Sequence, residues 1–303
     1  MDTLSDVLAI LRPQTFVSAG LDAGKEWAIQ FPPHDGIKFN AILKGTCYLQ
    51  VEGDENVYLL HAGDCFLLTS GRRFVMGSDL SIPTIHSDTI FSHAKDGIAT
   101  CNGGGSCFLT GARFHFGDQS ARLLFGQLPP VVYVPEKYDQ AAVLRWGIER
   151  FTTEFRSERF GRRTILEHLA PIMLVQTLRI YMSSPGAKNT GWFAAVVHPN
   201  LGVVMQAIHS RPQEKWTVES LSELAYMSRS GFALKFRQVI GQSPLEYLTQ
   251  WRMFMAAEYL KSTDQSISEI ALAVGYESES SFSAAFKKVM GAAPRSYKGS
   301  AVK

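Results

Sequence analysis

Two stretches of the chain place polar and cationic side chains at matching positions around a pair of phenylalanines. Phe232 and Phe236 form the first pair, and Phe282 and Phe286 form the second pair fifty positions later. Such side chains can read base edges or hold phosphates through hydrogen bonds, and small apolar ones can contact thymine methyl groups. The candidates are Arg229, Ser230, Ala233, Leu234, Lys235 and Arg237 in the first stretch, and Glu279, Ser280, Ser283, Ala284, Lys287 and Lys288 in the second. The chemistry that they offer is recognition of nucleic acid.

The elements that must position these side chains form an internal repeat. Beyond the phenylalanines, the repeat comprises Gly241, Pro244 and Tyr247, which recur as Gly291, Pro294 and Tyr297. Apolar residues at helical spacing lead to each glycine, and each proline redirects the chain after it. The tripeptide at 223–225 recurs only 46 positions on, at 269–271, so we expect the second copy to have gained four residues at its turn. The pattern predicts helix-turn-helix units over about 218–241 and 266–291, joined by a helix over 244–260.

A helix-turn-helix unit lays its second helix in the major groove of DNA. If the connecting helix holds the two units one DNA turn apart, about 34 Å, both second helices can enter successive grooves on one face of the duplex. An ordinary all-α bundle is the alternative, because apolar residues at helical spacing often form only a core. Duplication of the turn, the glycine and the proline together favours the DNA-binding interpretation.

The repeat resembles the tandem helix-turn-helix domain of the AraC/XylS family of bacterial transcription regulators. The segments ALKFRQVIGQSPLEYL and SISEIALAVGYESESSFSAAFKKVMGAAPRSY carry the resemblance, which covers about 199–298. It implies a sequence-specific protein that binds double-stranded promoter DNA, usually as an activator that contacts RNA polymerase. The family often has arginine where this chain has Leu234 and Ala284, so contacts with thymine methyl groups are expected there. Lys235 and Lys288 are better suited to phosphate contacts.

The first 127 residues have a different texture, with short β-rich runs between glycine and polar turns. The runs lie at 27–31, 38–43, 46–52, 57–60, 65–68, 106–109 and 113–116. This spacing predicts a sandwich or jelly roll. The segment FNAILKGTCYLQVEGDENVYLLHAGDCFLLTSGRRF resembles a cupin half-barrel of the type attached to a subgroup of AraC/XylS regulators. The expected fold class is therefore multi-domain α+β, with an N-terminal cupin-like jelly roll, a helical section and a C-terminal all-α tandem helix-turn-helix domain.

A small-molecule effector is a possible occupant of the barrel. By strand alternation and by their polar groups, the candidate ligand-binding residues are Trp27, His34, Phe39, Tyr48, Phe66, Phe74 and His115. The alternative is that the aromatic residues are simple core. A cupin enzyme would need clustered histidines, and Phe74 stands where the second cupin motif usually has one, so we expect no catalytic residue, no metal and no cofactor.

The alternative class of function is that the barrel is a metal or redox sensor, or a vestigial cupin enzyme. The metal or redox sensor would use Cys101 and Cys107 with His86, His93 and His115. The spacing of the two cysteines matches no standard zinc motif, and residues 103–105 are three glycines typical of a hairpin tip. The binding of DNA under the control of a regulatory barrel is the favoured prediction.

Residues 128–191 are predicted to form a helical dimerisation section and a linker, between the domains at 1–127 and 199–298. The helix around 164–181 is apolar over so wide an arc that it must pack on more than one side. A homodimer contact, which the resemblance suggests, and burial within one chain both satisfy that need.

Composition fits a cytoplasmic protein. The 303 residues are 46% hydrophobic and 19% charged, with a net charge of +2, which is typical of globular domains. Lysine and arginine exceed aspartate and glutamate only over the predicted DNA-binding third. No apolar run is long enough to suggest a membrane span, and the four cysteines are expected to be free thiols.

Overall fold

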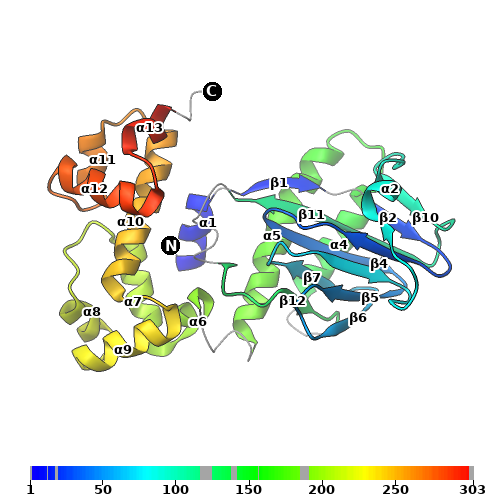
Figure 1. The fold of residues 1–303 in the computed structure, drawn as a ribbon, viewed down its shortest axis with the longest axis horizontal. Coiled ribbons are helices and arrows are strands. Elements are labelled where there is room, and N and C mark those ends of the chain that lie inside the picture. The colour runs from blue at the N-terminus through cyan, green and yellow to red at the C-terminus, as the bar shows by residue number, and fades with distance from the viewer. Residues whose placement is uncertain are drawn as a thin grey trace. The chain divides into compact units, whose positions relative to one another are not determined.

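The computed structural model describes residues 2–11, 13–17, 20–116, 125–137, 142–155, 157–184 and 191–299, with backbone alone for Lys298 and Gly299. Its contacts divide the chain into two units (Figure 1). The sandwich unit contains Pro13–Phe116 and Leu128–Ser184, and the helical unit contains Met1–Arg12, Gly117–Gln127 and Pro185–Lys303. The three-part division at 127 and 191 stays a prediction. Residues 185–190 of the predicted linker lie outside the described residues.

The sandwich unit is built from two β-sheets, which confirms the predicted β-rich N-terminal fold. The larger sheet has the order β10-β2-β11-β4-β7-β12, and β1 pairs with β11 beside it. Its strands are β1 (Gln14–Val17), β2 (Gly20–Ala23), β4 (Ile37–Lys44), β7 (Cys65–Leu68), β10 (Ile98–Cys101), β11 (Cys107–His115) and β12 (Val131–Val134). The smaller sheet has the order β6-β5-β8-β3-β9. Its strands are β3 (Ala28–Phe31), β5 (Thr46–Val51), β6 (Val57–His61), β8 (Phe74–Gly77) and β9 (Ile85–His86).

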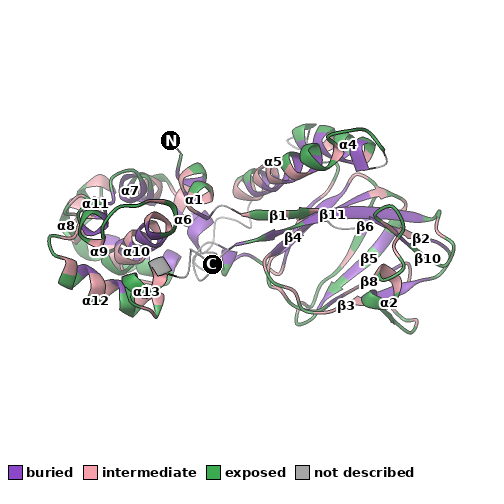
Figure 2. Ribbon diagram, turned by 90° about the horizontal axis from the view of Figure 1, so that it is seen from above, coloured by how far each residue is buried: buried purple, intermediate pink, exposed green. Residues whose placement is uncertain are grey.

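Both faces of the larger sheet are covered. The inner face packs against the smaller sheet through a core that includes Trp27, Ile42 and Phe66. Two helices, α4 (Ala142–Phe155) and α5 (Arg162–Ser183), lie over the outer face (Figure 2). A short helix, α2 (Ser87–Phe91), follows β9. Consequently, every residue of β4 is wholly or partly buried except Lys44, the exposed residue at its end.

Most of the apolar residues of the long helix α5 are buried within the chain. Leu166, Met173 and Leu178 are buried, whereas Ile165 and Ile172 are exposed. Of the two interpretations of its wide apolar arc, burial within the chain therefore accounts for much of it, and the exposed residues are what remains for a partner.

The helical unit contains the predicted repeat. Its helices are α1 (Thr3–Leu11), α6 (Trp192–Val197), α7 (Pro199–Ser210), α8 (Val218–Leu224), α9 (Arg229–Ile240), α10 (Pro244–Ser262), α11 (Ile267–Ala273), α12 (Glu279–Met290) and α13 (Pro294–Gly299). The N-terminal helix α1 packs against α7 and α10, an arrangement that the sequence did not predict. The core of the second copy joins α10 to α11 and α12 and contains Phe282 and Phe286.

The register of the repeat differs from the predicted one. Thr217 and Ser266 cap the first helices of the two copies, 49 positions apart, and Ser228 and Ser278 cap the second helices, 50 positions apart. The turn has therefore gained one residue, and the predicted gain of four is wrong. The match of 223–225 with 269–271 is a coincidence of residue type, because buried Leu221 corresponds in position to buried Ile270.

Candidate nucleic-acid interface and ligand pocket

Each second helix of the repeat is fixed on the core by the phenylalanines that mark it. Phe232 and Phe236 are fully buried, with ring centroids 5.7 Å apart, and Phe236 lies edge-on to Tyr247 at 5.9 Å. In the second copy, Phe282 and Phe286 are 5.6 Å apart, and Phe286 meets Tyr297 at 5.5 Å. The repeated aromatic residues therefore anchor each second helix on its core. The side chains between them form the surface of the candidate interface.

Local chemistry sets where these helices begin and end. The side chain of Ser228 accepts a hydrogen bond from the backbone N–H of Gly231, and Ser278 does the same for Ser281. Each helix ends at a glycine in the left-handed region, Gly241 with φ of 87° and Gly291 with φ of 78°. Residues with a Cβ atom rarely adopt this conformation, so glycine stops both helices at equivalent points.

The structure places the predicted DNA-binding residues in two groups. The exposed ones are Arg229, Ser230, Leu234, Arg237, Ser280, Ala284, Lys287 and Lys288, and the half-buried ones are Ala233, Lys235, Glu279 and Ser283. Leu234 is 61% exposed, so its side chain is accessible to a partner. Glu279 is engaged within the chain, since it accepts a hydrogen bond from Ser268 and lies 3.8 Å from Arg295.

No residue in the described part of the chain neutralises the exposed cations of the two helices. Arg229 and Arg237 on α9, and Lys287 and Lys288 on α12, form no ion pair with any other residue that the structure describes. Lys215, by contrast, pairs with Glu277 in the turn before α12. Unpaired cations on two structurally equivalent helices match what phosphate and base contacts need.

A buried polar cluster supports the first copy. Trp192 Nε1 donates a hydrogen bond to the Tyr247 hydroxyl at 2.9 Å, and His209 Nε2 lies 2.6 Å from the same oxygen. The His209 ring also lies 3.9 Å from the ring of Trp251, centroid to centroid. Burial lowers the pKa of His209 to about 3. The imidazole is therefore neutral at physiological pH and belongs to the core.

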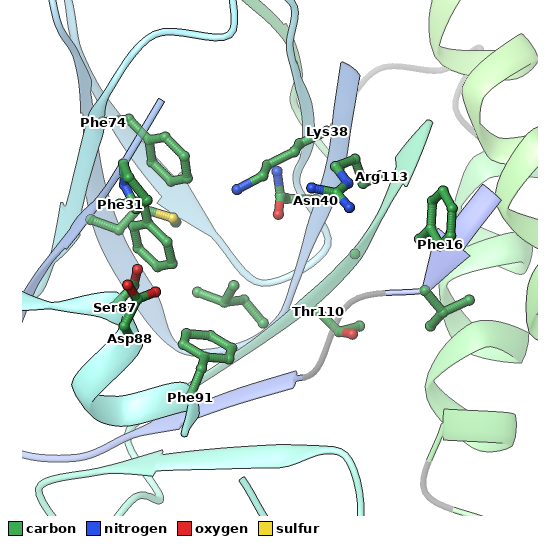
Figure 3. Close-up of a pocket in the computed structure, with 15 residues that line it drawn as sticks. Phe16, Phe31, Lys38, Asn40, Phe74, Ser87, Asp88, Phe91, Thr110 and Arg113 are labelled. Carbon is green, nitrogen blue, oxygen red and sulfur yellow. The ribbon is translucent and has the colours of Figure 1, made fainter. Parts of the chain in front are cut away.

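The sandwich unit contains a pocket of about 370 Å³ between its two sheets (Figure 3). Phe31, Phe74 and Phe91 form an aromatic side, and Lys38, Asn40 and Arg113 form a polar side. The remaining lining comes from Phe16, Val17, Pro32, Met76, Ser87, Asp88, Leu109, Thr110 and Gly111. Its size lies at the lower end of the range for small-molecule sites.

Lys38 and Arg113 are directly opposite each other on β4 and β11. Burial, and secondarily the Arg113 guanidinium, lower the pKa of Lys38 to about 8. The Lys38 ammonium lies 5.1 Å from the ring centroid of Phe74 and 5.8 Å from that of Phe31. Like charges in directly opposed strand positions destabilise a sheet, so this pair is costly to the fold.

Of the residues predicted to bind a ligand, only Phe74 lines this pocket. Trp27 and Phe66 lie in the core between the sheets, and Tyr48 is exposed on the smaller sheet. Phe39 alternates with Lys38 and Asn40 and therefore faces away from the pocket, toward the layer of helices. His115 is exposed, and His34 packs edge-on against Phe74 outside the lining, where burial lowers its pKa to about 4.

The cysteines and histidines of the metal or redox alternative do not come together. Cys101 and Cys107 lie next to Ala23 on opposite sides of β2, so two strand spacings, roughly 10 Å, separate them. A disulfide needs a much shorter separation of the Cα atoms. All four cysteines are free and buried, and the described part of the chain has no cluster of three metal-ligating side chains.

The two-sheet unit and the duplicated helix-turn-helix define a cupin-type protein that binds DNA. Comparison with known proteins agrees. A cupin family model matches residues 2–183, and a helix-turn-helix domain model matches residues 221–300. A protein of Streptomyces lividans named as an AraC-like transcription regulator is 39% identical, over 91% of each chain. The regulator AlkR of Acinetobacter baylyi is 30% identical, over 83% of this chain and 84% of its own.

The chain belongs to the AraC-like transcription regulators, which are DNA-binding proteins, and the predicted family is confirmed. Among solved structures, the DNA-binding domain of AdpA in complex with a target DNA is 32% identical. That match covers 34% of this chain and 91% of the domain, with a TM-score of 0.32. The AraC-like relatives from Streptomyces lividans and Acinetobacter baylyi, both named as regulators, do not favour the metal-sensor or enzyme alternative. In the described residues, no helix is long and apolar enough to cross a membrane.

Proposed function

We propose that α9 and α12 are the recognition helices and that they enter successive major grooves of promoter DNA. The observation that carries this proposal is the pair of equivalent, capped helices whose exposed cations have no partner within the described chain. On α9, Arg229 and Ser230 stand in the first turn, which is the part of a recognition helix that reaches base edges. Lys235 and Lys288 contact phosphates.

The two small apolar positions give the proposed interface its base preference. Leu234 and Ala284 are both exposed on their helices. Neither can form the bidentate hydrogen bonds by which arginine selects guanine, whereas both can pack on a thymine methyl group. The half-sites that this protein prefers therefore contain A·T pairs opposite these two residues.

The sandwich unit regulates this binding, and the protein is not an enzyme. The pocket between the sheets holds a small-molecule effector that changes how the chain engages DNA. Exposed apolar residues on the covering helices, including Val143, Trp146 and Ile172, form a homodimer contact. The dimer acts in the cytoplasm as an activator that contacts RNA polymerase at the promoter, and residues 1–127, 128–191 and 199–298 divide the sensory, dimerisation and DNA-binding roles.

DNA selected from a random library by the full chain tests the recognition helices. In fluorescence anisotropy at two salt concentrations, we expect selected DNA to bind about 10³-fold or more tightly than a scrambled duplex. The selected sequences should contain two half-sites about one turn apart.

Two variants separate the roles of the side chains. Arg229→Ala should change which bases are selected, whereas Lys288→Ala should weaken selected and scrambled DNA by the same factor. Equal, salt-sensitive binding of both duplexes by the unaltered protein would refute sequence-specific recognition. Equal effects of the two substitutions on both duplexes would refute the division between base and phosphate contacts.

A further inference from the structure

The two cations of the pocket, Lys38 and Arg113, have no anionic partner among the described residues. Lys38 and Arg113 are opposed in register, and neither forms an ion pair with another described residue. The nearest carboxylate of the lining, Asp88, has a side chain that is 83% exposed and lies 3.5 Å from His86 Nδ1. Asp88 therefore lies at the rim of the pocket, and no described residue neutralises the positive charge inside.

A hydrogen-bond donor without an acceptor stands beside these cations. The Asn40 side-chain Nδ2 is buried and has no hydrogen-bond partner among the residues that the structure describes. Asn40 follows Lys38 by two positions on β4, so both side chains lie on the same face of the sheet (Figure 3). Buried donors are nearly always paired in native proteins, and a ligand oxygen placed between Lys38, Asn40 and Arg113 would satisfy all three groups.

The opposite wall of the pocket is apolar. Phe31 and Phe74 are stacked with ring centroids 4.5 Å apart, and Phe91 meets Phe31 edge-on at 6.1 Å. Met76, on β8 with Phe74, also lines this side. A fully hydrated ion such as free phosphate would leave these walls without a partner, and a metal cation would be repelled by Lys38 and Arg113.

We propose that the pocket binds a small organic carboxylate with a compact apolar body, and that this compound is the effector of the protein. The carboxylate lies between Lys38 and Arg113 and accepts a hydrogen bond from the Asn40 amide. The apolar body lies against Phe31, Phe74 and Phe91. This inference rests on the regulatory role given to the sandwich unit under Proposed function.

Calorimetric titration of the full chain tests the ligand class. The probes are benzoate, cyclohexanecarboxylate and hexanoate, each compared with its own amide, which keeps the shape and removes the charge. We expect at least one carboxylate to bind with a 1:1 stoichiometry and its amide to bind about ten- to a hundred-fold more weakly, as for the loss of charge-assisted hydrogen bonds. Lys38→Met and Arg113→Met should each weaken the binding of that carboxylate by a similar factor.

Lys95→Met is the matched control, because Lys95 is exposed in the same unit and lies outside the pocket. It should bind the carboxylate as the unaltered chain does, and circular dichroism should show that all three variants are folded. The inference is overturned if no carboxylate binds, if carboxylates and amides bind equally, or if binding survives in both pocket variants.

Anisotropy with the selected DNA separates this inference from the function on which it rests. Selective DNA binding by a chain that binds no carboxylate would refute the ligand class and leave the recognition helices standing. Carboxylate binding that leaves DNA affinity unchanged would refute the effector role. A shift in DNA affinity that Lys38→Met abolishes supports the whole proposal.

Discussion

Replacing Lys38 by methionine should make the ligand-free protein more stable. Burial and the Arg113 guanidinium lower the pKa of Lys38 from 10.5 to about 8. A difference of that size between the folded and unfolded states corresponds to about 3 kcal/mol of native-state stability at neutral pH. Methionine has a similar length and no charge, so it removes this cost. The lost attraction between the ammonium and the rings of Phe31 and Phe74 offsets part of the gain, which leaves about 1–3 kcal/mol.

The pH dependence of this effect has a definite sign. Between pH 8 and pH 10.5 the folded chain releases the Lys38 proton while the unfolded chain keeps it. The unfolded state therefore binds more protons, and the free energy of unfolding of the unaltered protein rises with pH across this window. The Lys38→Met variant lacks this contribution. Its advantage should be fully present below pH 8 and should disappear as the pH rises toward 10.5.

Differential scanning calorimetry of both full-length proteins at pH 7 and pH 10 measures the effect. A gain of 1 kcal/mol raises Tm by roughly 2–4 °C for a unit of this size. Lys95→Met should leave Tm unchanged at both values. An unchanged or lowered Tm for Lys38→Met at pH 7, or a gain in Tm that persists undiminished at pH 10, would contradict this reasoning. Either result would show that the buried charge of Lys38 does not destabilise the fold.

Two further predictions concern the helical unit. Phe236→Ala should lower the free energy of unfolding of this unit by about 3–5 kcal/mol, because the ring is fully buried, and should abolish DNA binding. Calorimetry should show its transition shifted while that of the sandwich unit stays in place; an equal shift of both would contradict the division into units. For His209, the pKa is lowered to about 3, so the unfolded state takes up a proton below pH 6.5 that the folded state refuses. Stability should therefore fall by about 2–3 kcal/mol between pH 6.5 and 4.5, measured by urea unfolding, and a His209→Phe variant should lose that slope.

The helices of the repeat could be predicted from the sequence because their signals are local. Glycine at the end of a helix, proline after it and phenylalanines at i and i+4 each act within a few residues. The register of the first helices could not be obtained in the same way. The similar tripeptides Glu-Leu-Ala at 223–225 and Glu-Ile-Ala at 269–271 suggested a gain of four positions, whereas the caps at Thr217 and Ser266 show that only one was gained. Capping serines and threonines are therefore a better guide to register here than residue identity.

The strands of the sandwich were also predictable from alternation, but the direction of their side chains was not. Alternation along β4 assigned Phe39 to the interior, and Lys38 and Asn40 were not among the predicted ligand-binding residues. That assignment assumes that one face of the sheet is exposed, whereas α4 and α5 cover the outer face of the larger sheet. Phe39 is buried under these helices, so the inner face was free to carry polar side chains. Which face of the sheet lies inside the sandwich therefore depended on α4 and α5, which come much later in the chain.

The two cations that sequence reasoning missed, Lys38 and Arg113, violate a local rule. They oppose each other in the sheet, line the pocket and have no carboxylate partner among the described residues, so they weaken the sheet that holds them. Folding alone does not account for Lys38, and a bound anion would supply the partner that the described residues do not provide. The cost in stability at Lys38 and the site for a ligand are then two aspects of the same side chain, and removing the charge should stabilise the fold while it weakens the binding.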